Sequence, residues 1–149
     1  MAEKFKLKFA VYLIPRRDNK VLLSLRENTG YMDGMYSLVA GHVDGGETGE
    51  EATIREAAEE AGVMIDPKDL KFAYIMHRLK NRPEDEYIDL FFEVRNWEGE
   101  FVNNEPEKCG GLDWFDIDKL PENTLPYISE AVTSYESGKH YSSTKGTES

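Results

Sequence analysis

Apolar and polar residues alternate along the first part of the chain, which is the pattern of half-buried β-strands. Across residues 5–14 the apolar positions alternate imperfectly with Lys and Tyr, and residues 21–25 form a short aliphatic run. The segment between them, residues 15–20, is rich in charged and turn-forming residues. This arrangement predicts two neighbouring strands joined by a turn.

Further apolar stretches predict that the sheet continues. Strand-like segments cover residues 36–39, 70–79, 87–95 and 112–115. A charged turn at residues 81–86 separates the two longest of them. The short strand at residues 36–39 leads into a glycine-rich segment, which we expect to be a loop.

The period changes to that of an α-helix between Thr48 and Gly62. Thr48 is followed three residues later by Glu51, the sequence of a capping box, and Gly62 can adopt the left-handed backbone that ends a helix. Between these signals, apolar residues recur at helical spacing at Ile54, Ala57, Ala58 and Ala61. Because three of the four are alanine, this helix can approach a sheet closely.

A second helix is predicted after Pro126, which fits a first helical turn. Its apolar stripe ends before Gly138 and consists of Ile128, Ala131, Val132 and Tyr135. Several strands with two helices interspersed, without strict β-α-β alternation, predict an α+β fold in which a mixed β-sheet is sandwiched between helices. We expect one domain over residues 1–138 and a mobile, low-complexity tail over residues 139–149.

Composition excludes several classes of function. The 149 residues suit one domain, and 29 acidic against 18 basic residues give a net charge of −11. This charge disfavours a nucleic-acid polymer or an anionic membrane as partner. The chain shows neither a membrane-spanning run nor a signal peptide, so we expect a cytoplasmic protein. Cys109, the only cysteine, excludes an intrachain disulfide and is interpreted as a small buried apolar residue.

The polar face of the first predicted helix carries an unusual group of carboxylates. Glu56, Glu59 and Glu60 lie opposite the alanine stripe. Like charges at these spacings destabilise a helix, and acidic residues in its last turn oppose the helix dipole. A solvated surface is one interpretation. A site for a hard divalent cation is the other, because carboxylate oxygens suit Mg²⁺ or Mn²⁺.

The stretch that contains this helix resembles the Nudix box, G-x5-E-x7-R-E-U-x-E-E-x-G-U, where U is a bulky aliphatic residue. The fixed positions are filled at the required spacing by Gly41, Glu47, Arg55, Glu56, Glu59, Glu60, Gly62 and Val63. Ala57 is smaller than the usual aliphatic residue. The strands predicted on both sides of the box also fit the Nudix fold. The chain is therefore similar to Nudix hydrolases over nearly its whole length.

This resemblance implies Mg²⁺-dependent hydrolysis of a nucleoside diphosphate linked to a variable group. It implies that the metal, for which Mn²⁺ is an alternative, is held by the backbone carbonyl of Ala40 and by Glu56, Glu59 and Glu60. A carboxylate outside the box, Glu105, resembles one that some nucleotide-hydrolysing members use. Either Glu105 or Glu56 would activate the attacking water, and the sequence does not choose between them.

Other residues receive roles from the same resemblance. We expect Arg55, which we count with the catalytic residues, to pair with Glu47. This pair would brace the loop against the helix. The alternative is an ordinary surface ion pair. Gly62 is a structural position that ends the helix. His42 and Gly41, in the loop of the box, are candidates for contact with substrate, although a hydrogen-bonded loop histidine is the favoured interpretation of His42.

Two further sets of residues keep two interpretations each. Arg26 follows the second predicted strand, where similar proteins bind phosphate, and is otherwise a solvated strand end. Three aromatic residues are able to stack on a nucleobase, but strand aromatics are more often part of a core; they are Tyr36, Phe92 and Trp114.

The leading hypothesis is a nucleoside triphosphate pyrophosphohydrolase that clears oxidised or non-standard nucleotides. An ADP-ribose or nucleotide-sugar pyrophosphatase is the alternative with the same chemistry, and a non-catalytic nucleotide sensor on the same fold is the alternative from another class. The expected partner is a small-molecule nucleotide, and self-association as a homodimer through sheet edges or loops is also considered.

Overall fold

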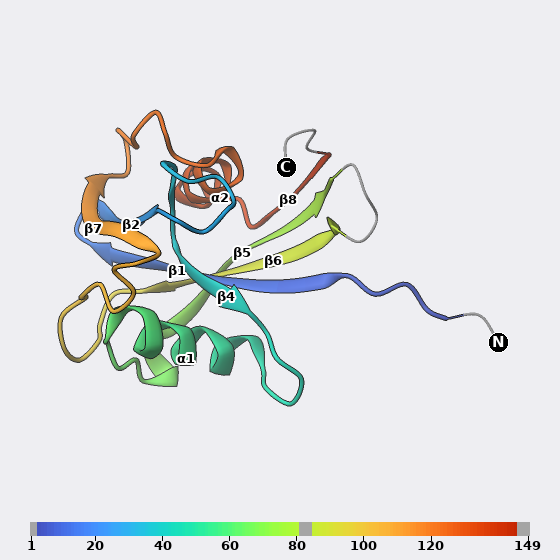
Figure 1. Cartoon of the computed structure of the whole chain (residues 1–149), viewed down its shortest axis with the longest axis horizontal. Helices are drawn as coiled ribbons and strands as arrows, with labels where there is room; N and C mark the ends of the chain where they lie inside the picture. The colour runs from blue at the N-terminus through green and yellow to red at the C-terminus, as the bar shows by residue number, and fades with distance from the viewer. Residues whose placement is uncertain (1–2, 81–84, 146–149) are drawn as a thin grey trace.

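A mixed β-sheet with a helix on each face forms the body of the molecule (Figure 1). The computed structural model describes residues 3–80 and 85–145. The elements within these ranges are β1 (Lys8–Arg17), β2 (Lys20–Arg26), β3 (Tyr36–Ser37), β4 (Val39–His42), α1 (Gly49–Ala61), a 3-10 turn (Pro67–Asp69), β5 (Leu70–Leu79), β6 (Tyr87–Val94), β7 (Cys109–Asp116), α2 (Pro126–Glu136) and β8 (Tyr141–Lys145).

The sheet is organised around β1. Its main path runs β3-β2-β1-β6-β5-β8, while β4 also pairs with β1 and β7 with β2. The β1–β6 and β5–β8 pairs are parallel and the other pairs are antiparallel. The predicted α+β fold with a mixed sheet between helices is confirmed.

Alternation along β1 supplies side chains to both layers. Ala10, Tyr12 and Ile14 belong to the core under α2, whereas Leu13 belongs to the core under α1. Successive residues of a strand point to opposite faces, so one strand holds both layers together. The same alternation places Tyr12 at the cleft described below.

The predicted signals of α1 are confirmed. The Thr48 hydroxyl accepts a hydrogen bond from the Glu51 N–H, and the Glu51 side chain accepts one from the Thr48 N–H. Gly62 ends the helix with a φ of 72°. Ala57 and Ala61 are completely buried against the sheet, and the carboxylates lie on the other side of the helix.

Two local predictions were wrong. Residues 15–17 belong to β1, and the turn before β2 is only Asp18 and Asn19, with Asp18 at a φ of 55°. A proline is tolerated in this strand because Pro15 pairs with Val94 at the end of the β1–β6 ladder. The single strand predicted at residues 36–39 is divided into β3 and β4, which pair with different strands.

Part of the tail that the sequence predicts to be mobile forms a strand, β8, in the described structure. β8 extends the sheet by pairing in parallel with β5, and the Ile75 N–H donates to the His140 carbonyl at 2.9 Å. The exposed edge of β5 offers backbone groups that any sequence can pair with, so low-complexity side chains do not prevent a strand. Residues 146–149 of that tail, and residues 81–84 of the predicted charged turn, lie outside the described residues.

No helix in the described parts of the chain has the length and apolar character needed to cross a membrane.

Candidate active site

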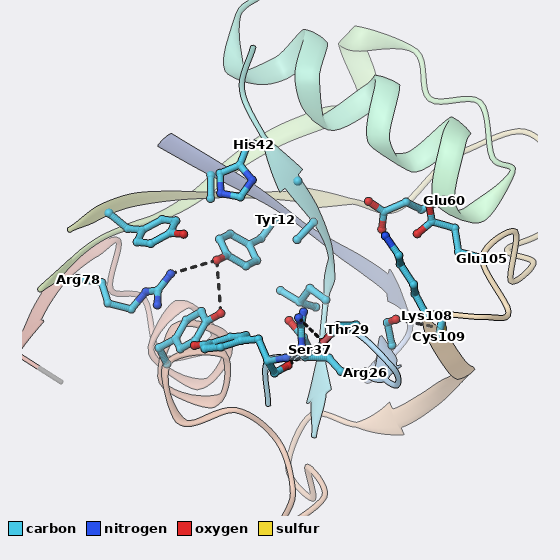
Figure 2. A pocket seen from close by; sticks show the side chains of 18 of the residues that line it. Tyr12, Arg26, Thr29, Ser37, His42, Glu60, Arg78, Glu105, Lys108 and Cys109 are labelled. Atoms are coloured by element: carbon cyan, nitrogen blue, oxygen red, sulfur yellow. Dashed lines mark hydrogen bonds between the residues drawn. The ribbon is translucent and has the colours of Figure 1, made fainter. Parts of the chain in front are cut away.

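A cleft of about 660 Å³ lies between the C-terminal end of α1 and the N-terminal end of α2 (Figure 2). β1, β2 and β4 contribute to its floor. One end contains the carboxylates of Glu60 and Glu105 together with Lys108. The other end contains four tyrosines and two basic residues, which are Tyr12, Tyr31, Tyr87, Tyr127, Arg78 and Lys80.

The carboxylates of Glu56, Glu60 and Glu105 form a compact group, called the carboxylate cluster below. The pKa of Glu60 is raised to about 9, first by burial and then by a hydrogen bond with Glu56 and the charges of Glu56 and Glu105. A backbone hydrogen bond from Ala40 acts in the opposite direction. Repulsion among these carboxylates means that the cluster favours either a proton or a cation.

The chain assembles this cluster from two separate segments. The Asn104 N–H donates to the Glu60 carbonyl at 3.1 Å, and the Val102 N–H donates to the Ala61 carbonyl at 2.9 Å. These bonds tie the segment before β7 to the end of α1 and bring Glu105 beside Glu60. They also satisfy helix-terminal carbonyls, which need partners.

The box loop is held by a forked ion pair. Arg55 donates to the two carboxylate oxygens of Glu47 at 2.7 and 3.1 Å, and to the His42 carbonyl at 3.2 Å. The hydrogen bond from Arg55 lowers the pKa of the Glu47 carboxyl, and the Asp44 N–H adds a further bond at 2.9 Å. This geometry agrees with the predicted bracing of loop and helix.

The three box glutamates are not equivalent in their surroundings. Glu56 lies against Gly41, where a Cβ would overlap its carboxylate, and accepts a hydrogen bond from Arg55 at 3.1 Å. Glu59 has a side chain that is 60% exposed, and its contact with Arg55 is longer, at 3.4 Å. Glu60 alone of the three lines the cleft.

The residues of the cluster fit a hard divalent cation by their chemistry. Within residues 3–80 and 85–145, no three His, Cys, Asp or Glu side chains are already arranged as a metal site. The Glu56 carboxylate also contacts Arg55, at 3.1 Å. Burial first, and then the neighbouring carboxylates, raise the pKa of Glu60, so a cation beside it would be favourable, and all the donors of the cluster are oxygens, as Mg²⁺ prefers.

Arg26 lines the cleft, as expected for a residue that binds phosphate. Its Nε donates to the Tyr31 carbonyl at 2.7 Å, and a terminal nitrogen donates to the Thr29 hydroxyl at 3.0 Å. Asp33 accepts hydrogen bonds from Thr29 and Gly30 and thereby fixes this loop. The side chain is therefore held by the loop rather than solvated as a strand end.

Gly41 and His42 also line the cleft. The His42 ring lies 5.9 Å from the Tyr87 ring, and its backbone carbonyl accepts the hydrogen bond from Arg55. The His42 ring faces the cleft (Figure 2), and it is the backbone carbonyl of His42, at the end of β4, that the hydrogen bond from Arg55 ties to α1.

The tyrosine-lined end of the cleft was missed by sequence reasoning. Arg78 forms a buried ion pair with Asp89 at 2.7 Å, and its guanidinium lies 3.9 Å from the ring centroid of Tyr127 and 4.5 Å from that of Tyr87. Burial raises the pKa values of Tyr12 and Tyr127, so both hydroxyls stay protonated. These residues come from four elements, and the only sequence signal is their alternation along predicted strands.

Lys108 was missed as well. A hydrogen bond from its N–H to the Glu105 carbonyl at 2.9 Å closes a turn, and its carbonyl accepts from Glu27 at 3.0 Å. Figure 2 shows the Lys108 side chain extended toward the carboxylates of Glu60 and Glu105. In the sequence, Lys108 lies three residues after Glu105, and this spacing was the only indication that its side chain lies near the same carboxylates.

The remaining candidates separate clearly. Phe92 is buried, Tyr36 packs on Phe115, and Trp114 stacks on Trp97 away from the cleft, so these three aromatics belong to packing clusters.

The interpretation of Cys109 as a buried residue was wrong, because it is half-buried in the cleft wall with its sulfur 3.3 Å from the Ser24 hydroxyl. The register of β7 on β2 places it there.

Comparison with known proteins agrees with this fold and site. The sequence profile of the NUDIX domain matches residues 5–134. A MutT NUDIX hydrolase from Burkholderia pseudomallei superimposes with a TM-score of 0.78 at 23% identity, covering 86% of this chain and 97% of that one.

Named relatives differ in what they act on. An 8-oxo-dGTP diphosphatase from Escherichia coli K12 is 29% identical over 85% of this chain and 93% of its own length. An ADP-ribose pyrophosphatase from Methanocaldococcus jannaschii is 32% identical over 77% of this chain and 71% of its own length. An NAD-capped RNA hydrolase, NudC, from Chromobacterium violaceum is 32% identical over 78% of this chain, which spans only 41% of the length of that relative.

The chain belongs to the NUDIX family and is a Nudix hydrolase. Members of this family act on small nucleotide substrates and generally need divalent metal ions.

Proposed function

We propose that this protein is a Mg²⁺-dependent nucleoside triphosphate pyrophosphohydrolase, which breaks a diphosphate linkage by attack of water on phosphorus. The observation that carries the proposal is the carboxylate cluster at one end of a cleft whose walls are basic and aromatic. A cation at the cluster would hold phosphates, and the tyrosine-lined end would receive the nucleoside. The similarity to the 8-oxo-dGTP diphosphatase, over most of its length, supports oxidised or non-standard nucleotides as substrates.

The residues proposed to hold the cation are Glu56 and Glu60, with Glu59 and the Ala40 carbonyl completing the set. When bound, Mg²⁺ or Mn²⁺ would neutralise the charge that develops on the substrate phosphates. Glu56 contacts both Glu60 and Arg55, and Arg55 keeps two further bonds to Glu47. Arg55, on α1, is therefore proposed to position the cluster while it stays bonded to Glu47 in the box loop.

Glu105 is our candidate for the general base. It lines the cleft beside Glu60 but does not belong to α1. Glu105 can therefore accept a proton from water while the glutamates of α1 remain bound to the cation. Glu56 stays the alternative, because it belongs to the same cluster.

Positive side chains are proposed to bind the phosphates. Lys108 lines the cleft at its carboxylate end, Arg26 lines it beside the Tyr31 ring, 5.2 Å away, and His42 faces it from β4. In a protein with a net charge of −11, these groups give the cleft its affinity for an anion of small size. The proposed partner is accordingly a free nucleotide in the cytoplasm and no nucleic-acid polymer.

A second candidate substrate is ADP-ribose or a nucleotide sugar. The cleft volume of about 660 Å³ lies in the range for drug-sized ligands and gives room for a group beyond the diphosphate. The ADP-ribose pyrophosphatase relative supports this alternative. A non-catalytic nucleotide sensor is the third candidate, and the complete set of box residues argues against it.

A substrate panel with and without Mg²⁺ tests these candidates. A triphosphate pyrophosphohydrolase releases pyrophosphate and a nucleoside monophosphate, whereas ADP-ribose gives AMP and a sugar phosphate. We expect Glu60→Gln and Glu59→Gln each to lower turnover by orders of magnitude, while Glu122→Gln, an exposed glutamate elsewhere, leaves it unchanged. Full activity of both box variants would overturn the metal assignment, and ligand binding without turnover of any substrate would favour the sensor.

A further inference from the structure

One face of the sheet carries an exposed apolar surface. Among the residues that the structure describes, seven large hydrophobic side chains are exposed, and five of them belong to this surface: Phe5, Leu7, Phe9, Phe72 and Tyr141. Most of the exposed apolar area of a soluble protein is scattered, so such a concentration requires an explanation. We call these five residues the open face.

Contacts and register place the sheet residues of the open face, Phe9, Phe72 and Tyr141, on the side of the sheet where α1 packs. A Cβ at Gly49, the first residue of α1, would lie 3.5 Å from Phe9 and 3.7 Å from Phe92. The Phe92 ring contacts Phe72 edge-to-face at 6.5 Å, and Tyr141 pairs with Ile75 in the same part of the sheet. α1 packs mainly on β4 and β1, so β5 and β8 are left uncovered on this side (Figure 1).

The first residues of the chain extend this surface as an arm. Residues 3–7 precede β1 and run outward from the body in Figure 1. Within residues 3–80 and 85–145, their backbone makes no hydrogen bond to another segment. The alternation of lysine with Phe5, Leu7 and Phe9 puts the apolar side chains on one side of an extended arm and the lysines on the other.

We propose that the open face is the interface of a homodimer, in which the arm of each copy, with Phe5 and Leu7, lies across Phe9, Phe72 and Tyr141 on the sheet of the other. The arrangement is isologous, because each copy donates one arm and offers one face. It gives the arm backbone and the apolar side chains the partners that they lack within the described part of one chain. This inference does not depend on the proposed hydrolysis.

Charge complementarity favours a second copy of this acidic chain as the occupant. Lys4 and Lys6 make no ion pair among the described residues, and the first turn of α1, which borders the open face, carries Glu50 and Glu51. A basic arm on an acidic protein with a net charge of −11 finds its counter-charge on another copy. From the exposed fractions, the five side chains present on the order of 500 Å² per copy, a large part of the roughly 800 Å² per partner that a standard interface buries.

The oligomeric state in solution tests the interface. We expect the wild-type chain to be a dimer at micromolar concentration by light scattering and sedimentation. The double variant Phe5→Ser with Leu7→Ser removes apolar surface from exposed positions without touching the core, and is expected to be a folded monomer. Met64→Ser is the matched control, because Met64 is 62% exposed and lies outside the open face, and it is expected to stay dimeric.

A cross-link tests the geometry of the exchange. In a Cys109→Ser background, one protein carries Leu7→Cys and the other carries Phe72→Cys. Mixing the two under mild oxidation should yield a disulfide-linked heterodimer, whereas Leu7→Cys mixed with Met64→Cys should not.

Three results would overturn the proposal. They are a wild-type chain that is monomeric at every concentration, a dimer that persists in the arm variant, and equal cross-linking to positions 72 and 64. A wild-type monomer that binds vesicles of anionic lipid through the arm would likewise overturn it and assign the open face to a membrane surface.

Discussion

Gly41 touches Glu56 so closely that the site tolerates no side chain at this position. We predict that Gly41→Ala displaces the Glu56 carboxylate, since the added Cβ would overlap it. Mg²⁺ affinity should fall by about tenfold or more, as for other residues that orient metal ligands, and circular dichroism should show a folded protein. Gly45→Ala is the control, because a Cβ at Gly45 would meet no atom within 4 Å. Equal Mg²⁺ binding by the two variants would contradict the close contact.

Arg55 illustrates how one side chain serves positioning more than stability. We predict that Arg55→Lys lowers kcat by about tenfold to hundredfold, because lysine lacks the fork that joins Glu47, the His42 carbonyl and Glu56. The loss of unfolding free energy should be below about 1 kcal/mol for this partly exposed pair. Thermal unfolding and steady-state kinetics on the same preparation separate the two effects. A large fall in stability with kcat unchanged would contradict this role.

At the residue scale, the sequence predicted one end of the cleft and missed the other. The box glutamates and Arg55 have fixed spacing on one helix and loop, so local periodicity is enough to group them. Strand pairing and the packing of α2 bring together Tyr12, Tyr87 and Tyr127. Their spacing in the sequence does not predict that they are neighbours. Cys109 was misjudged for the same reason.

The N-terminal cap of α1 supports the helix that presents the cluster. Thr48→Ala removes the hydroxyl that accepts from the Glu51 N–H, and is predicted to cost about 1 kcal/mol of unfolding free energy. Chemical denaturation measures this change. Thr133→Ala, in which an exposed helical threonine loses only a bond to a carbonyl of the preceding turn, should cost clearly less. Equal losses in the two variants would show that the cap contributes nothing special.

The C-terminal strand β8 is predicted to contribute to the stability of the sheet. Ending the chain after Lys139 removes the strand that pairs with β5, and we expect a measurable fall in melting temperature. Ser142→Ala should leave stability unchanged or raise it, because the Ser142 hydroxyl is buried without a hydrogen-bond partner. A truncated chain that melts at the wild-type temperature would show that β8 adds nothing to the stability of the sheet.

Elements with strong local signals were predicted well, and pairing was not. The capping box and Gly62 defined α1, and the apolar stripe defined α2, because these signals lie within a few residues of one another. The division of residues 36–42 between β3 and β4, and the recruitment of β8, depend on which edges of distant strands are free. Those edges exist only in the assembled sheet.

The whole molecule gains stability from the cation that it is proposed to bind. Mg²⁺ at the carboxylate cluster would relieve the repulsion around Glu60, and a ligand that binds only the folded state stabilises it. At a concentration of about 100 times the Kd, the gain is about 2.7 kcal/mol. We therefore predict a rise in melting temperature with Mg²⁺ that a chelator reverses, that Glu60→Gln lacks and that Glu122→Gln keeps. An unchanged melting temperature at saturating Mg²⁺ would contradict a cation at this cluster.

Cys109 has a practical consequence that follows from its place in the cleft wall. Because it is the only cysteine in the chain, a thiol reagent can modify one position alone, and that position lines the cleft together with Glu105 and Lys108. A small fluorophore attached there would report the arrival of a nucleotide through a change in emission, without the need to observe turnover. The protein thus carries its own attachment point for an optical readout of occupancy, which can rank unreacted analogues as readily as true substrates.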